Sequence, residues 1–151
     1  MKKIIVASDS HCDTYNLKHI AKVHPDAIAY LHAGDSQDYE ANLYPFVTVR
    51  GNNDYYVSNE TRIINIEPLR IYMTHGHKMY LSEENMVNKA KQVDCNMFIY
   101  GHTHSPFYQV VDGVHLLNPG SVRNSRSIIG PTYAIILINE NNEIEVTFET
   151  I

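Results

Sequence analysis

The sequence contains no tryptophan and only two cysteines among its 151 residues. Two cysteines, Cys12 and Cys95, are too few for a disulfide framework. We expect both to be reduced, which favours a cytoplasmic location. No apolar run has the length of a membrane span, so no membrane partner is expected. Two lysines and a short apolar run occupy residues 2–7, but acidic residues and a histidine follow directly, so we expect a first strand there and not a signal peptide.

Positive charge is also scarce. The chain has 12 Lys and Arg against 17 Asp and Glu, a net charge of -5, and its basic residues are scattered along the sequence. Stable nucleic-acid binding requires clustered basic residues on the phosphate backbone, so this pattern argues against it. The length fits one domain, residues 1–151, with a real core. We find no linker, repeat or low-complexity segment that would divide it.

Histidine, in contrast, is abundant, with nine residues, and it occurs in pairs. An apolar run at 98–100 ends at Gly101 and is followed by His102 and His104. Residues two apart in an extended segment point to the same side, so both imidazoles can reach one small volume. The same arrangement recurs at residues 9–11 and 75–77, each time after an apolar run. Three such occurrences indicate metal binding.

Periodicity predicts the remaining elements. We expect helices at 13–24 and 82–93, and a short helix ending near 44. Strands are expected at 1–7, 27–32, 46–49 and 98–100, with hairpins at 61–73, 108–117 and 133–148. Alternating strands and helices followed by hairpins predict an α/β fold with a mixed sheet, or with two sheets packed face to face and helices outside. Every candidate ligand follows a predicted strand, where open α/β sheets place their ligand crevice.

The candidate ligands at these strand ends are oxygen and imidazole donors without a thiolate: Asp9, His11, Asp35, Asn52, His75, His102 and His104. This set suits manganese, iron, nickel or zinc at octahedral or five-coordinate sites better than a structural zinc site. Seven ligands are too many for one ion. Two ions about 3.5–4 Å apart that share the Asp35 carboxylate would use all seven and would form a clamp suited to phosphoryl transfer.

Five motifs occur in order: Asp9-x-His11, Gly34-Asp35-x-x-Asp38, Gly51-Asn52-x-Asp54, His75-Gly76-His77 and Gly101-His102-x-His104. The turn at 118–121 follows them. Together they resemble the calcineurin-like metallophosphoesterases, and more narrowly their small bacterial and archaeal phosphodiesterase branch. The resemblance covers nearly the whole chain. It implies a four-layer α-β-β-α sandwich of two mixed sheets flanked by helices.

The resemblance also implies the ligand sets. One ion would be held by Asp9, His11, Asp35 and His104, and the other by Asp35, Asn52, His75 and His102. It implies two divalent ions per chain, with manganese the first choice and nickel, iron and zinc as alternatives. A metal-bridging hydroxide would attack phosphorus in line with the leaving oxygen.

Two positions depart from the family pattern. Many relatives have a histidine after the motif asparagine that protonates the leaving group, whereas this chain has Asn53, which cannot act as a general acid. His77 or a metal-bound water would take that role, or the substrate has an acidic leaving alcohol. Cys12 stands where the family usually has glycine. Its side chain either narrows the site or adds an oxidisable thiol beside the metals, or it is a small buried residue, which is the reading we expect.

Five further residues are assigned with alternatives left open. Asp38 and Asp54 either orient the ligand loops from behind or cap their own loops. His77 contacts either the substrate or a backbone carbonyl. Arg123, like Arg126, either receives a phosphate or lies on a solvated surface. We count Asp35, Asn52, His77 and Asp54 as candidate catalytic residues.

The function predicted from these observations is the hydrolysis of a small phosphodiester. The alternative is a non-catalytic interaction scaffold on the same fold, like the metallophosphoesterase-like subunit of the retromer coat. A mononuclear hydrolase is a third possibility, but it would leave Asn52 and His75 without a purpose. Because relatives are often dimers or tetramers, a homo-oligomer is also expected.

Overall fold

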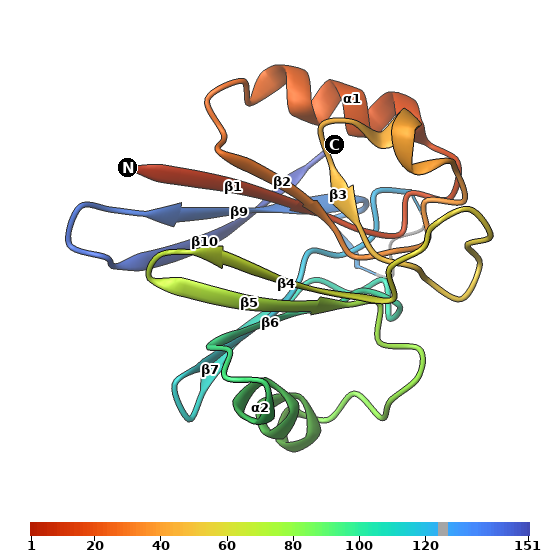
Figure 1. Cartoon of the computed structure of the whole chain (residues 1–151). Coiled ribbons are helices and arrows are strands. Elements are labelled where there is room, and N and C mark those ends of the chain that lie inside the picture. The colour runs from red at the N-terminus through yellow and green to blue at the C-terminus, as the bar shows by residue number, and fades with distance from the viewer. Residues whose placement is uncertain (124–126) are drawn as a thin grey trace.

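Two five-stranded mixed sheets face each other in the computed structural model, which describes residues 1–123 and 127–151. One helix covers the outer face of each sheet (Figure 1). The first half comprises β1 (Lys2–Ala7), α1 (Thr14–Val23), β2 (Ala29–His32), the 3-10 helix η1 (Glu40–Leu43), β3 (Val47–Thr48), β4 (Thr61–Ile66) and β5 (Leu69–Thr74). The second half comprises α2 (Glu83–Gln92), β6 (Met97–Ile99), β7 (Phe107–Val111), β8 (Val114–Asn118), β9 (Thr132–Ile138) and β10 (Ile144–Thr150).

The parallel strands of both sheets end on the same side of the molecule. The first sheet has the order β10-β9-β1-β2-β3, and β1, β2 and β3 run parallel. The second has the order β4-β5-β6-β8-β7, and β5, β6 and β8 run parallel. The loops that leave β1, β2 and β5 therefore meet at the right of Figure 1.

Three apolar clusters hold the four layers together. The largest lies between the sheets and includes Ile4, Ile71 and Ile136, all fully buried. A second joins α1 to the first sheet, and a third joins α2 to the second sheet. Each fully buried aliphatic side chain contributes about 1.5–3 kcal/mol. The predicted α-β-β-α architecture is confirmed.

Both long helices begin where the sequence predicts. The Asp13 side chain accepts a hydrogen bond from the Asn16 backbone N–H at the start of α1. Ser82 accepts one from the Asn85 backbone N–H at the start of α2. These side chains satisfy backbone donors that have no partner within the helix. No helix in the described ranges is both long and apolar enough to span a membrane.

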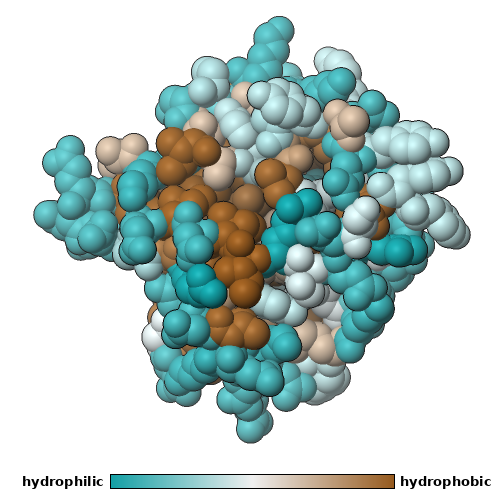
Figure 2. Space-filling view, viewed as in Figure 1, coloured by the Kyte–Doolittle hydropathy of each residue, from teal (hydrophilic) through white to brown (hydrophobic). Residues whose placement is uncertain are grey.

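The strand predicted at 46–49 is shorter than expected, because only Val47 and Thr48 pair with β2. Phe46 instead joins the outer cluster beneath α1. As the edge strand of the first sheet, β3 lies beside β4, the edge strand of the second, and Arg62 Nε of β4 donates to the Thr48 carbonyl at 2.6 Å. Apolar side chains gather across the front of the molecule, over strands of both sheets (Figure 2).

Candidate metal centre

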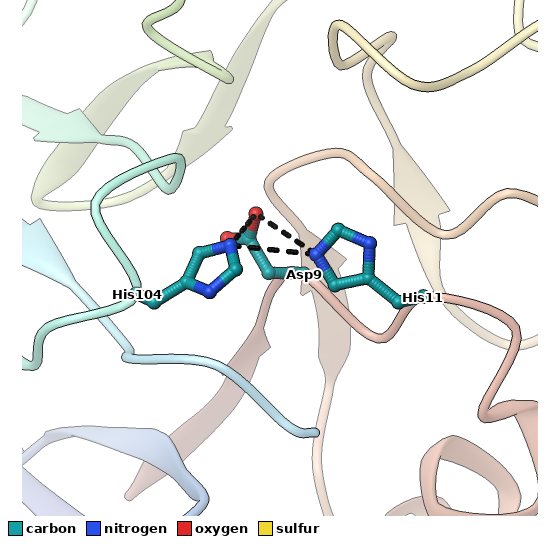
Figure 3. A group of neighbouring side chains, drawn as sticks. All are labelled: Asp9, His11 and His104. Carbon is teal, nitrogen blue, oxygen red and sulfur yellow. Dashed lines mark hydrogen bonds and ion pairs between the residues drawn. The ribbon is translucent and has the colours of Figure 1, made fainter. Parts of the chain in front are cut away.

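All seven predicted ligands lie in loops at the carboxyl ends of five strands. Asp9 and His11 follow β1, Asp35 follows β2, and Asn52 follows β3. His75 directly follows β5, and the pair at 102 and 104 follows β6. The side chains of Asp9, His11 and His104 point toward one another (Figure 3). The arrangement brings together residues that are up to 95 positions apart in the sequence.

Asp9, His11 and His104 form a first group that could hold a metal ion. His104 Nε2 lies 3.2 Å from Asp9 Oδ1 and 3.4 Å from His11 Nε2. His11 Nε2 lies 3.9 Å from the same carboxylate oxygen. Three electron-rich atoms thus face one small volume.

Asp9, Asp35 and His75 form a second group that could hold a metal ion, and all three are buried. His75 Nε2 lies 3.3 Å from Asp35 Oδ2 and 3.8 Å from Asp9 Oδ1. Asn52 Oδ1 lies 3.1 Å from the same nitrogen. Both groups share Asp9, whereas the sequence analysis and the family resemblance assign the shared carboxylate to Asp35.

The second ring nitrogens of two histidines have protein partners. His75 Nδ1 lies 2.8 Å from the Ala33 carbonyl oxygen, so it carries a proton and donates. His11 Nδ1 lies 2.7 Å from Gln37 Oε1. Such partners fix the tautomer of a metal-ligating histidine and leave the Nε2 lone pair free for the ion.

The oxygens around His75 favour a positive charge at its Nε2 atom. Its Nε2 faces oxygens of Asn52, Asp35 and Asp9. Neither carboxylate can donate a hydrogen bond in its ionised form, and the amide oxygen cannot donate at all. Burial lowers the pKa of His75, but the two carboxylates and the Ala33 carbonyl outweigh it, so the pKa is raised. A proton or a metal cation at Nε2 would compensate the negative charge of these oxygens.

One oxygen of Asp9 has no hydrogen bond. Oδ2 accepts from Ser8 Oγ at 2.6 Å and from the His102 backbone N–H at 3.1 Å. Oδ1 is buried and accepts no hydrogen bond of good geometry from the described residues. Burial raises the pKa of Asp9, but His104, His75 and Ser8 lower it by a larger amount. The net pKa is therefore below its usual value, and the group is ionised. A buried ionised oxygen without a hydrogen bond is costly unless a cation lies beside it.

Asp35 is positioned from two sides. Its oxygens accept from the Asn53 backbone N–H at 2.9 Å and from Asn53 Nδ2 at 3.0 Å. Its own backbone N–H donates to Asp54 Oδ2 at 2.9 Å. Burial raises the pKa of Asp35, but the bonds from His75 and Asn53 outweigh it and hold the pKa well below its usual range.

The backbone of the site is strained at the ligands. Five of the seven have φ values in the left-handed region: Asp9, His11, Asp35, His102 and His104. Each such non-glycine residue costs about 1–3 kcal/mol and persists only where the surrounding structure enforces it. Space is also tight, because a Cβ on Gly51 would lie 2.1 Å from Asp35 Oδ1. Such strain and crowding are typical of functional sites.

These observations together fit divalent metal ions. The donors are carboxylate, amide and imidazole groups, which suit manganese, iron, nickel or zinc. Asp9 Oδ1 lacks a hydrogen bond, and the lone pairs at Nε2 of His11 and His75 converge on the same region. Asn52 and His102 are the two exposed members of the set. His102 belongs to neither group, and its ring centroid lies 5.2 Å from that of His75.

Asp54 and Asp38, the two carboxylates predicted to support the ligand loops, have different roles in the structure. Asp54 is buried and accepts from the backbone N–H groups of Asp35, Gln37 and Gly51, so it shapes the Asp35 loop. Asp38 accepts from Thr14 Oγ1 and from neighbouring residues, which makes it a loop cap. It therefore acts away from the ligand atoms.

His77 lies beside the second group, with its ring centroid 5.5 Å from that of His75. Its Nδ1 is buried and has no hydrogen-bond partner among the described residues. Burial and the neighbouring His75, Lys78 and His102 lower its pKa, so the ring is neutral near pH 7. Nδ1 therefore binds no backbone carbonyl among the described residues, and contact of His77 with the substrate stays a prediction.

Three other predictions have mixed outcomes. Cys12 is exposed, so the expectation of a buried residue is wrong, although both cysteines are free as predicted. Its φ of 71° carries the side chain outward in the same left-handed turn that places His11. Arg123 Nη1 donates to the His11 carbonyl at 2.6 Å and so supports that loop. Arg126 lies outside the described residues.

Sequence reasoning missed several residues that support the ligands. Gln37 orients His11, and Ser8 fixes Asp9. The buried His32 joins Ser10 Oγ at 3.0 Å and Thr48 Oγ1 at 2.9 Å, and so ties the first ligand loop to β3. Ser8 was detectable as a small polar residue between an apolar strand and Asp9. The partners of Gln37 and His32 lie in other loops, and no local pattern predicts them.

Known proteins of similar sequence are metallophosphoesterases and phosphodiesterases by name. The model of the calcineurin-like phosphoesterase superfamily domain matches residues 1–141. A probable metallophosphoesterase of Mycoplasma pneumoniae is 32% identical over 165 aligned positions, which cover 98% of this chain and 97% of that protein. A phosphodiesterase of Methanocaldococcus jannaschii is 28% identical over 97% of this chain and 99% of its own length.

Solved structures show the same fold. A predicted phosphoesterase of Streptococcus pneumoniae superposes with a TM-score of 0.89 at 28% identity, over 99% of this chain and 89% of that one. Vps29 of Entamoeba histolytica, solved in complex with Zn²⁺, gives a TM-score of 0.74 at 22% identity, over 97% of this chain and 98% of that one. At that identity the second likeness shows the fold alone.

Proposed function

The chain belongs to the calcineurin-like phosphoesterase superfamily, and we propose that it is a dinuclear metal-dependent phosphodiesterase that hydrolyses a small phosphodiester. The observation that carries this proposal is the pair of ligand groups that share Asp9. One carboxylate between two sets of donors is the arrangement that a two-ion centre needs. The relative named as a phosphodiesterase supports the choice of diester over monoester.

The proposed ligands divide as the geometry suggests. Asp9, His11 and His104 would hold one ion, and Asp9, Asp35 and His75 would hold the other. Asn52 and His102 complete the proposed set beside His75. Two bound divalent ions would supply an activated water molecule and would neutralise charge on the phosphoryl oxygens.

The chain's own residues would position these groups and the substrate. Asn53 and Asp54 hold the Asp35 loop from two sides, so that its carboxylate cannot rotate freely. Neutral His77 lines the same cavity as Asn52 and is proposed to contact the substrate there. Because Asn53 cannot protonate a leaving group, we propose that the substrate has an acidic leaving alcohol.

A second candidate is an interaction scaffold on the same fold. The observation that favours it is the apolar surface over strands of both sheets in Figure 2. Several apolar side chains of the first four strands and their loops are exposed, among them Ile28, Val47 and Ile63 at 56%, 41% and 45%. Exposed apolar patches mark interaction surfaces in many soluble proteins. A scaffold does not require catalytic turnover, so an activity assay separates the two candidates.

The experiment measures hydrolysis of bis(p-nitrophenyl) phosphate and of p-nitrophenyl phosphate. Protein stripped of metal is reloaded with manganese and compared with an Asp35→Asn variant. We expect diester turnover that depends on metal, exceeds monoester turnover, and is lost in the variant. Absence of turnover with manganese, nickel, iron and zinc, in protein that binds two ions, would favour the scaffold.

A further inference from the structure

A cavity of about 450 Å³ lies on the outer side of the second sheet. Its walls come from the β4–β5 hairpin, from α2, and from the segment 76–79 that follows β5. Figure 1 shows this chain segment descending from the end of β5 to α2. The volume falls in the range of about 300–1,000 Å³ that is typical of small-molecule pockets. None of the seven proposed metal ligands lines it. We call it the α2 pocket.

The α2 pocket adjoins the metal centre through a second cavity. That cavity, of about 440 Å³, is lined by Asn52 and Arg50 and shares Glu60, His77 and Lys78 with the α2 pocket. His77 thus faces both cavities, beside His75. A substrate whose phosphate lies near Asn52 can therefore extend past His77 toward α2.

One face of α2 gives the α2 pocket its polar wall. The side chains of Asn85, Asn88, Lys89 and Gln92 all line it, at positions i, i+3, i+4 and i+7 of the helix. Residues at this spacing lie on the same helix face. Asn85 Nδ2 is bound to the Tyr80 carbonyl at 3.1 Å, which leaves its Oδ1 as an acceptor. The wall therefore presents three carboxamides and one ammonium group.

Carboxamides are well matched to the edges of heterocyclic bases. A base edge carries hydrogen-bond donors and acceptors side by side, as the amide does, and Asn or Gln pairs with adenine through two hydrogen bonds. Lysine pairs with the acceptors of guanine. The floor of the α2 pocket is aromatic, because Tyr72 lines it with its ring centroid 5.4 Å from that of Phe98. Lys89 Nζ lies 5.7 Å from the centroid of the Tyr72 ring.

An apolar group fits the α2 pocket poorly. A lipid chain would remove water from three carboxamides and an ammonium group and would offer them no hydrogen bond in return, which is unfavourable. A group that is flat and carries polar atoms at its edge avoids this loss. Lys78, which lines both cavities, forms an ion pair with Glu60, so its positive charge is already compensated.

We infer that the α2 pocket binds the base of a nucleotide substrate whose phosphodiester lies at the metal centre. This inference rests on the proposed function and specifies its substrate class. In this arrangement His77 contacts the part of the substrate between the phosphorus and the base. Asn88 and Gln92 read the base edge, and Lys89 closes the α2 pocket above Tyr72.

The first test measures binding without catalysis. Adenosine, guanosine, cytidine and uridine are titrated into manganese-loaded protein, with ribose as the control ligand, and binding is followed by saturation-transfer NMR and calorimetry. We expect at least one nucleoside to bind at least tenfold more tightly than ribose. The Asn88→Ala/Gln92→Ala variant should weaken that binding at least tenfold. A Glu84→Ala/Lys91→Ala variant, changed at two exposed α2 positions that do not line the α2 pocket, should leave it unchanged.

The second test measures selectivity in hydrolysis. The ratio of kcat/KM for a nucleoside 5′-(p-nitrophenyl phosphate) to that for bis(p-nitrophenyl) phosphate should exceed ten in the wild type. It should fall at least tenfold in the Asn88→Ala/Gln92→Ala variant, with bis(p-nitrophenyl) phosphate turnover retained. Nucleosides that bind no better than ribose, or equally well to both variants, would overturn the inference while diester turnover upholds the proposed function. Nucleoside binding without turnover of either ester would overturn the proposed function and leave the base site standing.

Discussion

The side-chain amide of Asn53 donates a hydrogen bond of 3.0 Å to Asp35 Oδ2. The backbone N–H of the same residue donates to Asp35 Oδ1 at 2.9 Å. Many relatives have histidine at this position, as an acid for the leaving group. In this chain the residue instead fixes a proposed metal ligand by two bonds. Where the family resemblance leads us to expect a proton donor, we therefore propose a positioning group.

Removal of this amide should weaken the site without unfolding it. In Asn53→Ala the backbone bond to Asp35 remains and the side-chain bond is lost, so we expect diester kcat/KM to fall about 10–100-fold, the usual cost of losing a group that orients a metal ligand. Asn53→Asp should be worse, because it places a second carboxylate against Asp35. Steady-state kinetics and metal analysis check both variants. Equal activity in wild type and Asn53→Ala would show that the amide does not position Asp35.

Asp9→Asn should separate metal binding from folding. The amide oxygen of the variant can still accept a hydrogen bond from Ser8 Oγ. Its NH₂ group, in the place of Oδ1, can donate toward Nε2 of His104. We therefore expect the melting temperature of metal-free protein to stay the same or rise. Metal affinity should fall by more than about 100-fold, since even outer partners of a ligand are worth 10–100-fold. Thermal unfolding with and without chelator, together with metal analysis, measures both effects. A metal-free variant that is less stable than metal-free wild type would contradict this account of Asp9.

Gly51→Ala should displace Asp35. The added methyl group would lie 2.1 Å from Asp35 Oδ1 and 2.6 Å from its backbone nitrogen, so the loop must move. We expect a loss of about 1–3 kcal/mol in the free energy of unfolding, as for other overpacked sites, and a loss of metal. Gly113→Ala is the control, because its methyl group would meet nothing within 4 Å and only its φ of +78° is strained. Denaturant titration and metal analysis should therefore show Gly113→Ala slightly destabilised and fully loaded. Full metal loading of Gly51→Ala would refute the steric argument.

The buried His32 should make stability depend on pH. Burial lowers its pKa from 6.5 to about 4, so between these values the unfolded chain binds a proton that the folded chain does not. Stability is therefore complete above pH 6.5 and falls as the pH drops toward 4, by at most about 3 kcal/mol. His24 and His115 have lowered pKa values too, so the comparison needs a variant. Denaturant titrations from pH 7.5 to 4 should show a smaller slope in His32→Gln than in wild type in the same metal state. Parallel curves would assign the pH dependence to other groups.

The layers, and the approach of the candidate ligands to one another, could be predicted from the sequence for a physical reason. Periodicity identifies strands and helices, and parallel strands deliver their following residues to one edge. Asp9, Asp35 and His75 therefore had to come close together once the strands were known. The helices begin close to the predicted residues, because Asp13 and Ser82 cap them through local hydrogen bonds.

The sequence could not predict the details that depend on contacts between loops. Gln37 reaches His11 only because left-handed residues turn the Asp35 loop back toward β1. His32 ends an apolar run in the sequence, yet it is completely buried between two hydroxyl groups. The position of Asp9 between both ligand groups depends on distances of a few tenths of an ångström, which no pattern of residue types specifies.

The measurement that tests the central claim most directly is a titration of metal-stripped protein with Mn²⁺, in which hydrolysis of bis(p-nitrophenyl) phosphate and bound metal are followed in the same samples. The account predicts that activity reaches its plateau only when two ions are bound per chain, and that Asp9→Asn, which loses the carboxylate shared by both groups, never reaches it. A plateau at one ion per chain, or full activity in the stripped protein, would contradict a two-ion phosphodiesterase.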